Sequence, residues 1–357
     1  MKLHKKLAFL AVLALLIRLF TALGAEAALD TLVQIAMQDE AIVTNAVFGQ
    51  SPLLLSAAQN LEFSEDTPVP TPPAIVEEET YVPEYIPEFL PPMQRPIERP
   101  LPPLPDFSSS ASPTASKIYL RNHTTYQVDI AELFYAPLSF DPSSGGSPTV
   151  LILHTHGTES FTPDALDWYE NTDNYRTNDT NLNIVRVGAE VASALEARGI
   201  HVIHSRQIHD YPSFRGSYGR SLTAAEAYLA RYPEIDIIFD IHRDAIMDAS
   251  GNYVRTLAEI PDTQAAQVML VVGTDHAGLY HPTWRNNLAF ALQLQGEMAA
   301  FHPTFPRPMS LREERFNHHL TPGSVLVEIG TNSNTLQEAL MAARIFAELA
   351  ANVILAD

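Results

Sequence analysis

The segment IDIIFDIHRDA, residues 235–245, is the most informative part of the sequence about the fold. It is an isoleucine-rich apolar run that is followed by histidine, arginine and aspartate. A short apolar run of this kind is typical of a strand that is buried on both faces of a parallel sheet. Two other segments have the same form, TVLILHTHGTESF at 149–161 and SVLVEIGTNSNT at 324–335. We therefore expect three strands of one sheet, each ending on polar side chains.

Amphipathic helices are expected between these strands. The pattern predicts further strands at 200–204 and 268–272, a strand and a short element within 118–138, and helices over 183–198, 222–231, 285–300 and 336–352. β-branched runs that alternate with amphipathic helices indicate an α/β fold, in which a mainly parallel sheet lies between two helical layers as an α/β/α sandwich.

The polar strand ends are the candidate site, since the carboxyl ends of parallel strands gather at one edge of a sheet. His156, Glu159 and His242 would supply two imidazoles and a carboxylate, which is a ligand set that catalytic zinc uses. Glu328 would be a free carboxylate beside them, able to take a proton from water and pass it to a leaving nitrogen. His154 is interpreted as a neighbour of the ligands or a substrate contact, or as a ligand itself.

The composition excludes several other classes of function. The chain of 357 residues has no cysteine, which excludes disulfides, thiolate metal ligands and a cysteine nucleophile. Its net charge of −20 argues against nucleic acid as a partner, because phosphate backbones require basic patches. The sequence also contains no G-x-S-x-G nucleophile elbow and no P-loop.

The chain before the α/β region has a different character. In residues 1–24, lysines precede the apolar run LAFLAVLALLI, which predicts a single-pass signal anchor or, with cleavage near Ala25-Glu26-Ala27, a signal peptide. Residues 25–116 are acidic and rich in proline, so we expect an extended, largely disordered spacer. Residues 117–357 are long enough to form one catalytic domain.

Five blocks of this domain, taken in order, resemble the stage II sporulation protein P family, which is related to the zinc-dependent N-acetylmuramoyl-L-alanine amidases. The resemblance covers essentially all of 117–357 and the layout of anchor and spacer. The blocks are HTHGTESF (154–161), NIVRVGAE (183–190), DIHRDA (240–245), VVGTDHAGLYHPTWRNNLAFA (271–291) and LTPGSVLVEIGTNSNTLQEA (320–339).

The resemblance implies a zinc amidase fold, Zn²⁺ as cofactor and His156, Glu159 and His242 as its ligands, with Glu328 as the catalytic carboxylate. In the wider amidase family the acidic ligand stands just before the first helix, where this chain has Asp173 or Asp179. The implied reaction cleaves the amide between N-acetylmuramic acid and L-alanine of peptidoglycan stem peptides, with endopeptidase activity on crosslinks as a further possibility.

Three more residues are assigned to the surroundings of the site. Arg243 is predicted to stabilise the oxyanion or bind a stem-peptide carboxylate, or else to form an ion pair at the sheet edge. Asp240 is expected beside the ligands. Asn317 is a candidate substrate contact, although the family pattern has Asn-Gln where this chain has Asn317-His318.

The same resemblance implies a cellular setting. It places the domain on the extracytoplasmic face of the cytoplasmic membrane, in sporulation and the remodelling of the engulfment septum. Its expected partners are peptidoglycan, the membrane through the N-terminal segment, and two other engulfment proteins, a lytic transglycosylase and a membrane scaffold. The alternative is a catalytically silent scaffold that binds peptidoglycan.

Overall fold

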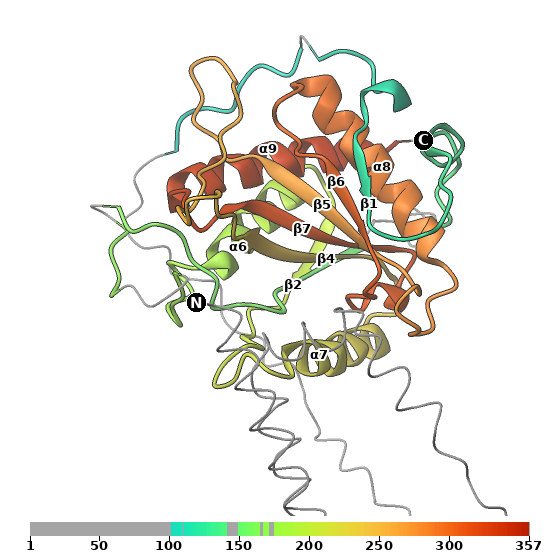
Figure 1. The fold of residues 1–357 in the computed structure, drawn as a ribbon, viewed down its shortest axis with the longest axis horizontal. Coiled ribbons are helices and arrows are strands. Elements are labelled where there is room, and N and C mark those ends of the chain that lie inside the picture. The colour runs from blue at the N-terminus through green and yellow to red at the C-terminus, as the bar shows by residue number, and fades with distance from the viewer. Residues whose placement is uncertain (1–100, 109, 141–148, 165–166, 171–174, 357) are drawn as a thin grey trace, which may run out of the picture. The chain divides into compact units, whose positions relative to one another are not determined.

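The structure is a computed structural model that describes residues 101–108, 110–140, 149–164, 167–170 and 175–356 (Figure 1). All of these belong to one unit of the chain, which extends over Tyr81–Asp357. The predicted signal segment and the predicted spacer up to residue 100 lie outside the described residues. Among the described helices, none has both the length and the apolar character needed to cross a bilayer.

A seven-stranded sheet is at the centre of the described unit, with the strand order β1-β6-β5-β7-β4-β2-β3. Five neighbouring pairs are parallel and one pair, β5 with β7, is antiparallel. This confirms the predicted α/β class with a mainly parallel sheet. The strands are β1 (Leu120–Asn122), β2 (Thr149–Leu153), β3 (His201–His204), β4 (Ile235–Asp244), β5 (Val268–Gly273), β6 (Met309–Arg312) and β7 (Gly323–Thr331).

The helices begin and end close to their predicted positions, with α7 starting five residues earlier than expected. Each of α6 and α9 begins at a polar cap: the side chain of Asn183 accepts a hydrogen bond from Val185 N, and Thr335 forms a capping box with Glu338. The helices are α5 (Ile130–Phe134), α6 (Ile184–Ala197), α7 (Ser217–Arg231), α8 (Trp284–Phe301) and α9 (Leu336–Ile354), with 3₁₀ turns η1 (Ala115–Lys117) and η2 (His318–Leu320).

The two faces of the sheet pack against different helices. Ile237, Phe239 and Ile241 of β4 belong to the large core that contains α6, α8 and α9. Ile238 instead packs in a smaller core with Ala225 of α7, on the opposite face. Figure 1 shows α7 on one side of the sheet and α8 and α9 on the other. Because strand side chains alternate between faces, the even-numbered polar residues of β4 point to the α7 side.

Residues 101–108 and 110–116, which the sequence analysis assigns to the spacer, lie against the domain. The rings of Phe107 and Phe301 are 4.8 Å apart, and Ala111 N donates a hydrogen bond to Ala300 O at 3.0 Å. The Arg344 guanidinium donates to Pro102 O at 3.0 Å. The described body therefore includes the last part of the proline-rich segment.

Gly188 of α6 allows a close approach that a larger residue would prevent. A Cβ at this position would lie 2.4 Å from Cε1 of the buried His154, whereas a Cβ at Gly219 in α7 would meet no atom within 4 Å. We expect Gly188→Ala to destabilise the domain by about 1–3 kcal/mol through overpacking. Gly219→Ala should stabilise it by about 0.5–1 kcal/mol, because alanine favours a helix interior. Urea unfolding of both variants measures the difference, and equal effects would contradict the packing at Gly188.

Candidate functional site

The pairing of β4 with β7 places His242 and Glu328 side by side, because the two residues are partners in the parallel register. Both side chains lie on the face of the sheet that α7 covers. The residue before each of them, Ile241 or Val327, points into the large core, and side chains alternate along a strand. His242 is 3 % exposed. A buried imidazole and a half-buried carboxyl group thus lie side by side at the carboxyl ends of two adjacent strands.

The turn after β2 brings two more candidate ligands to this position. Glu159 N donates to His156 O at 3.1 Å, which closes a tight turn. The Oε2 atom of Glu159 lies 3.5 Å from Nδ1 of His242. The rings of His156 and His242 are perpendicular, with centroids 5.3 Å apart. The structure therefore gathers His156, Glu159 and His242 into one group, which we call the His–Glu–His cluster.

Asp240 sets the orientation of the His242 ring. Its Oδ1 atom lies 2.9 Å from Nε2 of His242. The same carboxylate accepts hydrogen bonds from Thr155 N at 2.9 Å and Thr155 Oγ1 at 2.7 Å. With Nε2 turned to Asp240, the Nδ1 atom of His242 faces Glu159. Asp240 thus lies beside the predicted ligand His242.

The buried charges of the cluster shift the pKa values of its members. Burial opposes ionisation of Glu159, but the charges of Arg243 and His242 outweigh it and lower the pKa of this carboxyl. Burial also opposes protonation of His242, yet Asp240 and Glu159 raise its pKa well above the usual value. For His156, burial dominates and lowers the pKa to about 4. A neutral imidazole is the form that can bind a metal.

Glu328 behaves differently from Glu159. Burial, followed by the charge of Asp244, raises the pKa of its carboxyl to about 8. Its Oε2 atom is buried and accepts no hydrogen bond from a described residue. Perturbed carboxyl groups of this kind are common among catalytic acids and bases.

The structure places His154 outside the His–Glu–His cluster, and its expected role as a neighbour of the ligands, substrate contact or ligand stays a prediction. It is fully buried, with Nδ1 at 2.9 Å from Ile241 O and Nε2 at 2.9 Å from His204 Nε2. The ring lies against Gly188 on the α6 side of the sheet. The strand ends at Leu153, so the two-residue spacing from His154 to His156 does not keep the two side chains on one face.

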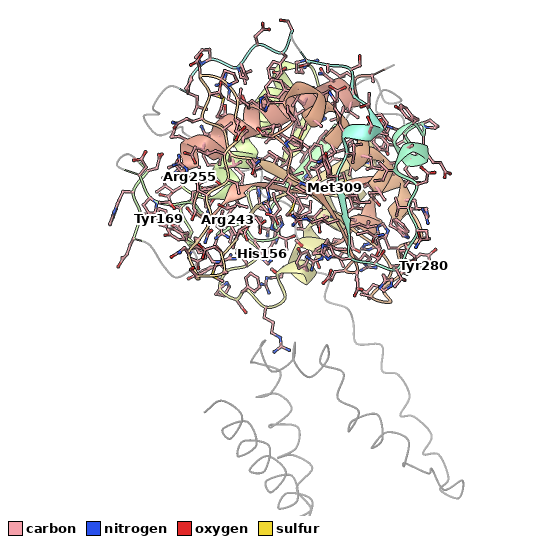
Figure 2. The ribbon with its side chains drawn as sticks, turned by 45° about the horizontal axis from the view of Figure 1, so that its top comes forward. His156, Tyr169, Arg243, Arg255, Tyr280 and Met309 are labelled. Carbon is pink, nitrogen blue, oxygen red and sulfur yellow. The ribbon has the colours of Figure 1, made fainter. Side chains whose placement is uncertain are left out.

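Arg243 is turned into the protein, with Nη1 at 3.9 Å from Glu159 Oε1, which resembles the ion-pair alternative; its expected role on the substrate stays a prediction. Its guanidinium is 2 % exposed and donates to Ser160 O at 2.9 Å and to Tyr175 O at 3.1 Å. Its backbone N donates to Glu159 Oε2 at 3.1 Å. Arg243 therefore supports the Glu159 segment from inside the protein. Figure 2 shows His156 and Arg243 on the same side of the domain, away from Tyr280.

Of the remaining candidates, the two that the structure describes, Asn317 and Asp179, lie outside the cluster. Asn317 donates from Nδ2 to Tyr218 O at 2.9 Å and to Ser221 Oγ at 3.2 Å, so it holds the start of α7. Asp179 is exposed and accepts hydrogen bonds from Asn181 in a local turn. Asp173 lies outside the described residues. Glu159 is thus the carboxylate that the structure places beside both histidines.

Two aromatic residues of the cluster's wall were not identified from the sequence. Phe214 stacks on His156, with ring centroids 4.3 Å apart and planes at 13°, and it remains 53 % exposed. Tyr218 approaches His156 edge-on at 5.6 Å. Both belong to the segment that enters α7, where the sequence shows no periodic pattern before residue 222. The start of α7 at Ser217 brings them over the turn that follows β2.

The cluster has the chemistry of a zinc site. Two imidazoles and a carboxylate are the donors that zinc prefers in the absence of thiolates. The Nδ1 atom of His156 is buried and forms no hydrogen bond with a described residue. Within the described ranges, no three histidine, cysteine, aspartate or glutamate side chains already stand at the spacing of a metal site. The residue types of the His–Glu–His cluster are nevertheless those that bind a zinc ion.

The fold and the cluster define an α/β domain with a buried histidine–carboxylate site at its strand ends. The chain belongs to the stage II sporulation protein P (SpoIIP) family, whose model matches residues 108–351. This confirms the family that the ordered blocks predicted. Over 218 residues the chain is 28 % identical to stage II sporulation protein P of Bacillus subtilis (strain 168), covering 58 % of this chain and 51 % of that protein. The chain thus spans about half the length of this curated relative.

Two solved amidase structures also match the chain. N-acetylmuramyl-L-alanine amidase Ami1 from Mycobacterium smegmatis is 17 % identical, with 58 % of this chain and 95 % of that chain covered and a TM-score of 0.33. The catalytic domain of CwlV, an N-acetylmuramoyl-L-alanine amidase from Bacillus (Paenibacillus) polymyxa var. colistinus, is 15 % identical, with 58 % and 93 % covered and a TM-score of 0.32. TM-scores this low establish nothing further about fold or activity.

Proposed function

We propose that this domain is a zinc-dependent hydrolase of the cell wall that cleaves the amide between N-acetylmuramic acid and L-alanine in peptidoglycan stem peptides. One observation carries the proposal. Glu328, a half-buried carboxyl group with a buried Oε2 atom and a raised pKa, is the register partner of His242 in the His–Glu–His cluster. Membership of the SpoIIP family supports a substrate in the cell wall.

His156, Glu159 and His242 would hold the zinc ion. When bound, Zn²⁺ supplies a Lewis acid that polarises the scissile carbonyl and makes water more acidic. Nε2 of His242 lies 2.9 Å from Asp240 Oδ1 and Nδ1 faces Glu159, so Nδ1 would be the zinc donor of this ring. Arg243 and Arg176 hold Glu159: the backbone N of Arg243 donates to Oε2, and Arg176 approaches Oε1 at 3.4 Å.

Glu328 performs the proton transfers of the reaction. Its carboxylate takes the proton of the attacking water and returns it to the L-alanine nitrogen as the amide bond breaks. The raised pKa brings the carboxyl close to neutral pH, where a group can both accept and donate a proton. The Oε2 atom of Glu328 is buried, and Phe214 and Tyr218 stand against His156 of the same cluster.

The cellular setting follows from the same proposal. The enzyme would act outside the cytoplasmic membrane, attached by its N-terminal segment or released after cleavage, on peptidoglycan of the engulfment septum. A lytic transglycosylase and a membrane scaffold would be its partners, and crosslink cleavage would be a second activity. The alternative is a silent scaffold that binds peptidoglycan. The presence of Glu328 at the cluster favours the enzyme, because a scaffold has no need of this carboxylate.

Metal analysis combined with a peptidoglycan digest tests the proposal. We expect the full chain to bind about one zinc ion and to release stem peptides that begin with L-alanine from purified sacculi. Mass spectrometry of the soluble fraction identifies the bond that is cut. Bound zinc without release of stem peptides would contradict the amidase and support the scaffold. Cleaved crosslinks without new L-alanine termini would show an endopeptidase instead.

A further inference from the structure

Asp210 is a buried carboxylate to which the proposed reaction gives no role. Its side chain is fully buried, and Oδ2 lies 4.0 Å from Nδ1 of His156. Thr158 donates to it twice, from its backbone N at 3.0 Å and from Oγ1 at 2.6 Å. Arg176 donates to Oδ2 at 2.6 Å. Three donors of the turn after β2 and its surroundings therefore converge on this carboxylate.

The position of Asp210 repeats the relation between Asp240 and His242. In that pair a carboxylate lies against the ring nitrogen that faces away from Glu159, at 2.9 Å. In the second pair Asp210 lies toward Nδ1 of His156, which, like Nε2 of His242, is buried and forms no hydrogen bond of regular geometry with a described residue. An orphaned buried donor is costly, and Asp210 is the carboxylate placed to satisfy it.

We propose that Asp210 is the positioning residue of His156: it accepts a hydrogen bond from Nδ1–H and thereby presents Nε2 as the metal donor. This inference rests on the proposed function. A carboxylate behind a ligating imidazole selects the tautomer, holds the ring and increases the basicity of the other nitrogen. The present distance of 4.0 Å exceeds a hydrogen bond, so the ring moves toward Asp210 by about 1 Å when the bond forms.

The anchoring of Asp210 makes it suited to this role. Thr158 lies on the same turn as His156. The two hydrogen bonds from Thr158 therefore hold the Asp210 carboxylate in a fixed position relative to the His156 ring. Arg176 contacts both Asp210 and Glu159. Arg176 therefore compensates two buried negative charges. It also links Glu159 of the cluster to Asp210, the carboxylate beside His156.

Asp210→Asn tests the inference, with Asp129→Asn as the matched control. Asp129 is an exposed cap of α5, which packs against α8 and η1, and asparagine caps a helix equally well. Competition with a chelating dye measures the affinity for Zn²⁺ in the full chain. We expect Asp210→Asn to weaken zinc binding about 10–100-fold and Asp129→Asn to leave it unchanged. Equal affinities of wild type and Asp210→Asn would overturn the inference.

A second readout separates positioning from a structural role. In the zinc-free wild type, ¹⁵N spectra of the imidazoles should show the proton of His156 on Nδ1, with His156→Gln identifying the signal. Asp210→Asn should move the population toward the Nε2–H tautomer without a matching change in the far-UV circular dichroism. A wild-type His156 protonated on Nε2 would overturn the inference whether or not zinc binds. Failure of the wild type to bind zinc would instead contradict the proposed function.

Discussion

Replacing Glu328 by glutamine is expected to reduce the release of stem peptides by about 10²–10⁴-fold, because an amide cannot accept the proton of the attacking water. Zinc binding should persist, since Glu328 is outside the His–Glu–His cluster. The fold should also persist. With a raised pKa of about 8, the carboxyl is largely protonated at neutral pH in the metal-free protein, and glutamine has the same shape and no charge.

The digest of purified sacculi measures this loss, with bound zinc determined on the same samples. Glu234→Gln is the matched control, because Glu234 is an exposed residue in the turn before β4. It should digest sacculi at the wild-type rate. If Glu328→Gln also digests at that rate, Glu328 has no part in the proton transfer.

Replacing His242 by alanine is expected to abolish zinc binding and to destabilise the metal-free domain by about 3–5 kcal/mol, the usual cost of leaving a buried charge without its partner. His242 lies 2.9 Å from Asp240 and 3.5 Å from Glu159, and both carboxylates are buried. Since these two charges keep the pKa of His242 high, the imidazolium stabilises them in return. Its loss leaves two negative groups close together.

His156→Ala provides the comparison, because it removes the other histidine of the cluster without removing a close carboxylate partner. Its side chain is 12 % exposed, and its nearest acidic atom, Asp210 Oδ2, is 4.0 Å away and held by Thr158 and Arg176. Zinc should be lost here as well, with a smaller loss of stability. Urea unfolding in the presence of a chelator measures both variants. Equal destabilisation would show that His242 does not neutralise the buried carboxylates.

The main elements of the fold could be predicted from the sequence because they are strongly periodic. The buried runs of β2, β4 and β7 are each bounded by polar residues, and α6, α8 and α9 lie within two residues of their expected limits. β6 was missed because Met309–Arg312 is a four-residue strand without alternation. The antiparallel pairing of β5 with β7 is a long-range contact that no local pattern encodes.

The candidate site was predicted only in part, for a similar reason. Side chains at the ends of strands can be identified by type, and the residues predicted in this way, His156, Glu159, His242 and Glu328, lie close together in the structure. Their orientation depends on where the strand ends, and the end of β2 at Leu153 turns His154 to the α6 side. Residues that reach the site from loops, such as Asp210, carry no signal in the sequence.

By itself, the sequence determined the alternation of strands and helices, the family, and the types of donor available, since these depend on local hydrophobic pattern, on ordered motifs and on the absence of cysteine. Only the tertiary structure decided which donors meet. The register of β4 with β7 pairs His242 with Glu328, and burial turns Arg243 inward to Ser160 and Tyr175. The physical reason is that contacts between distant segments depend on strand register and on burial, and both are properties of the packed chain.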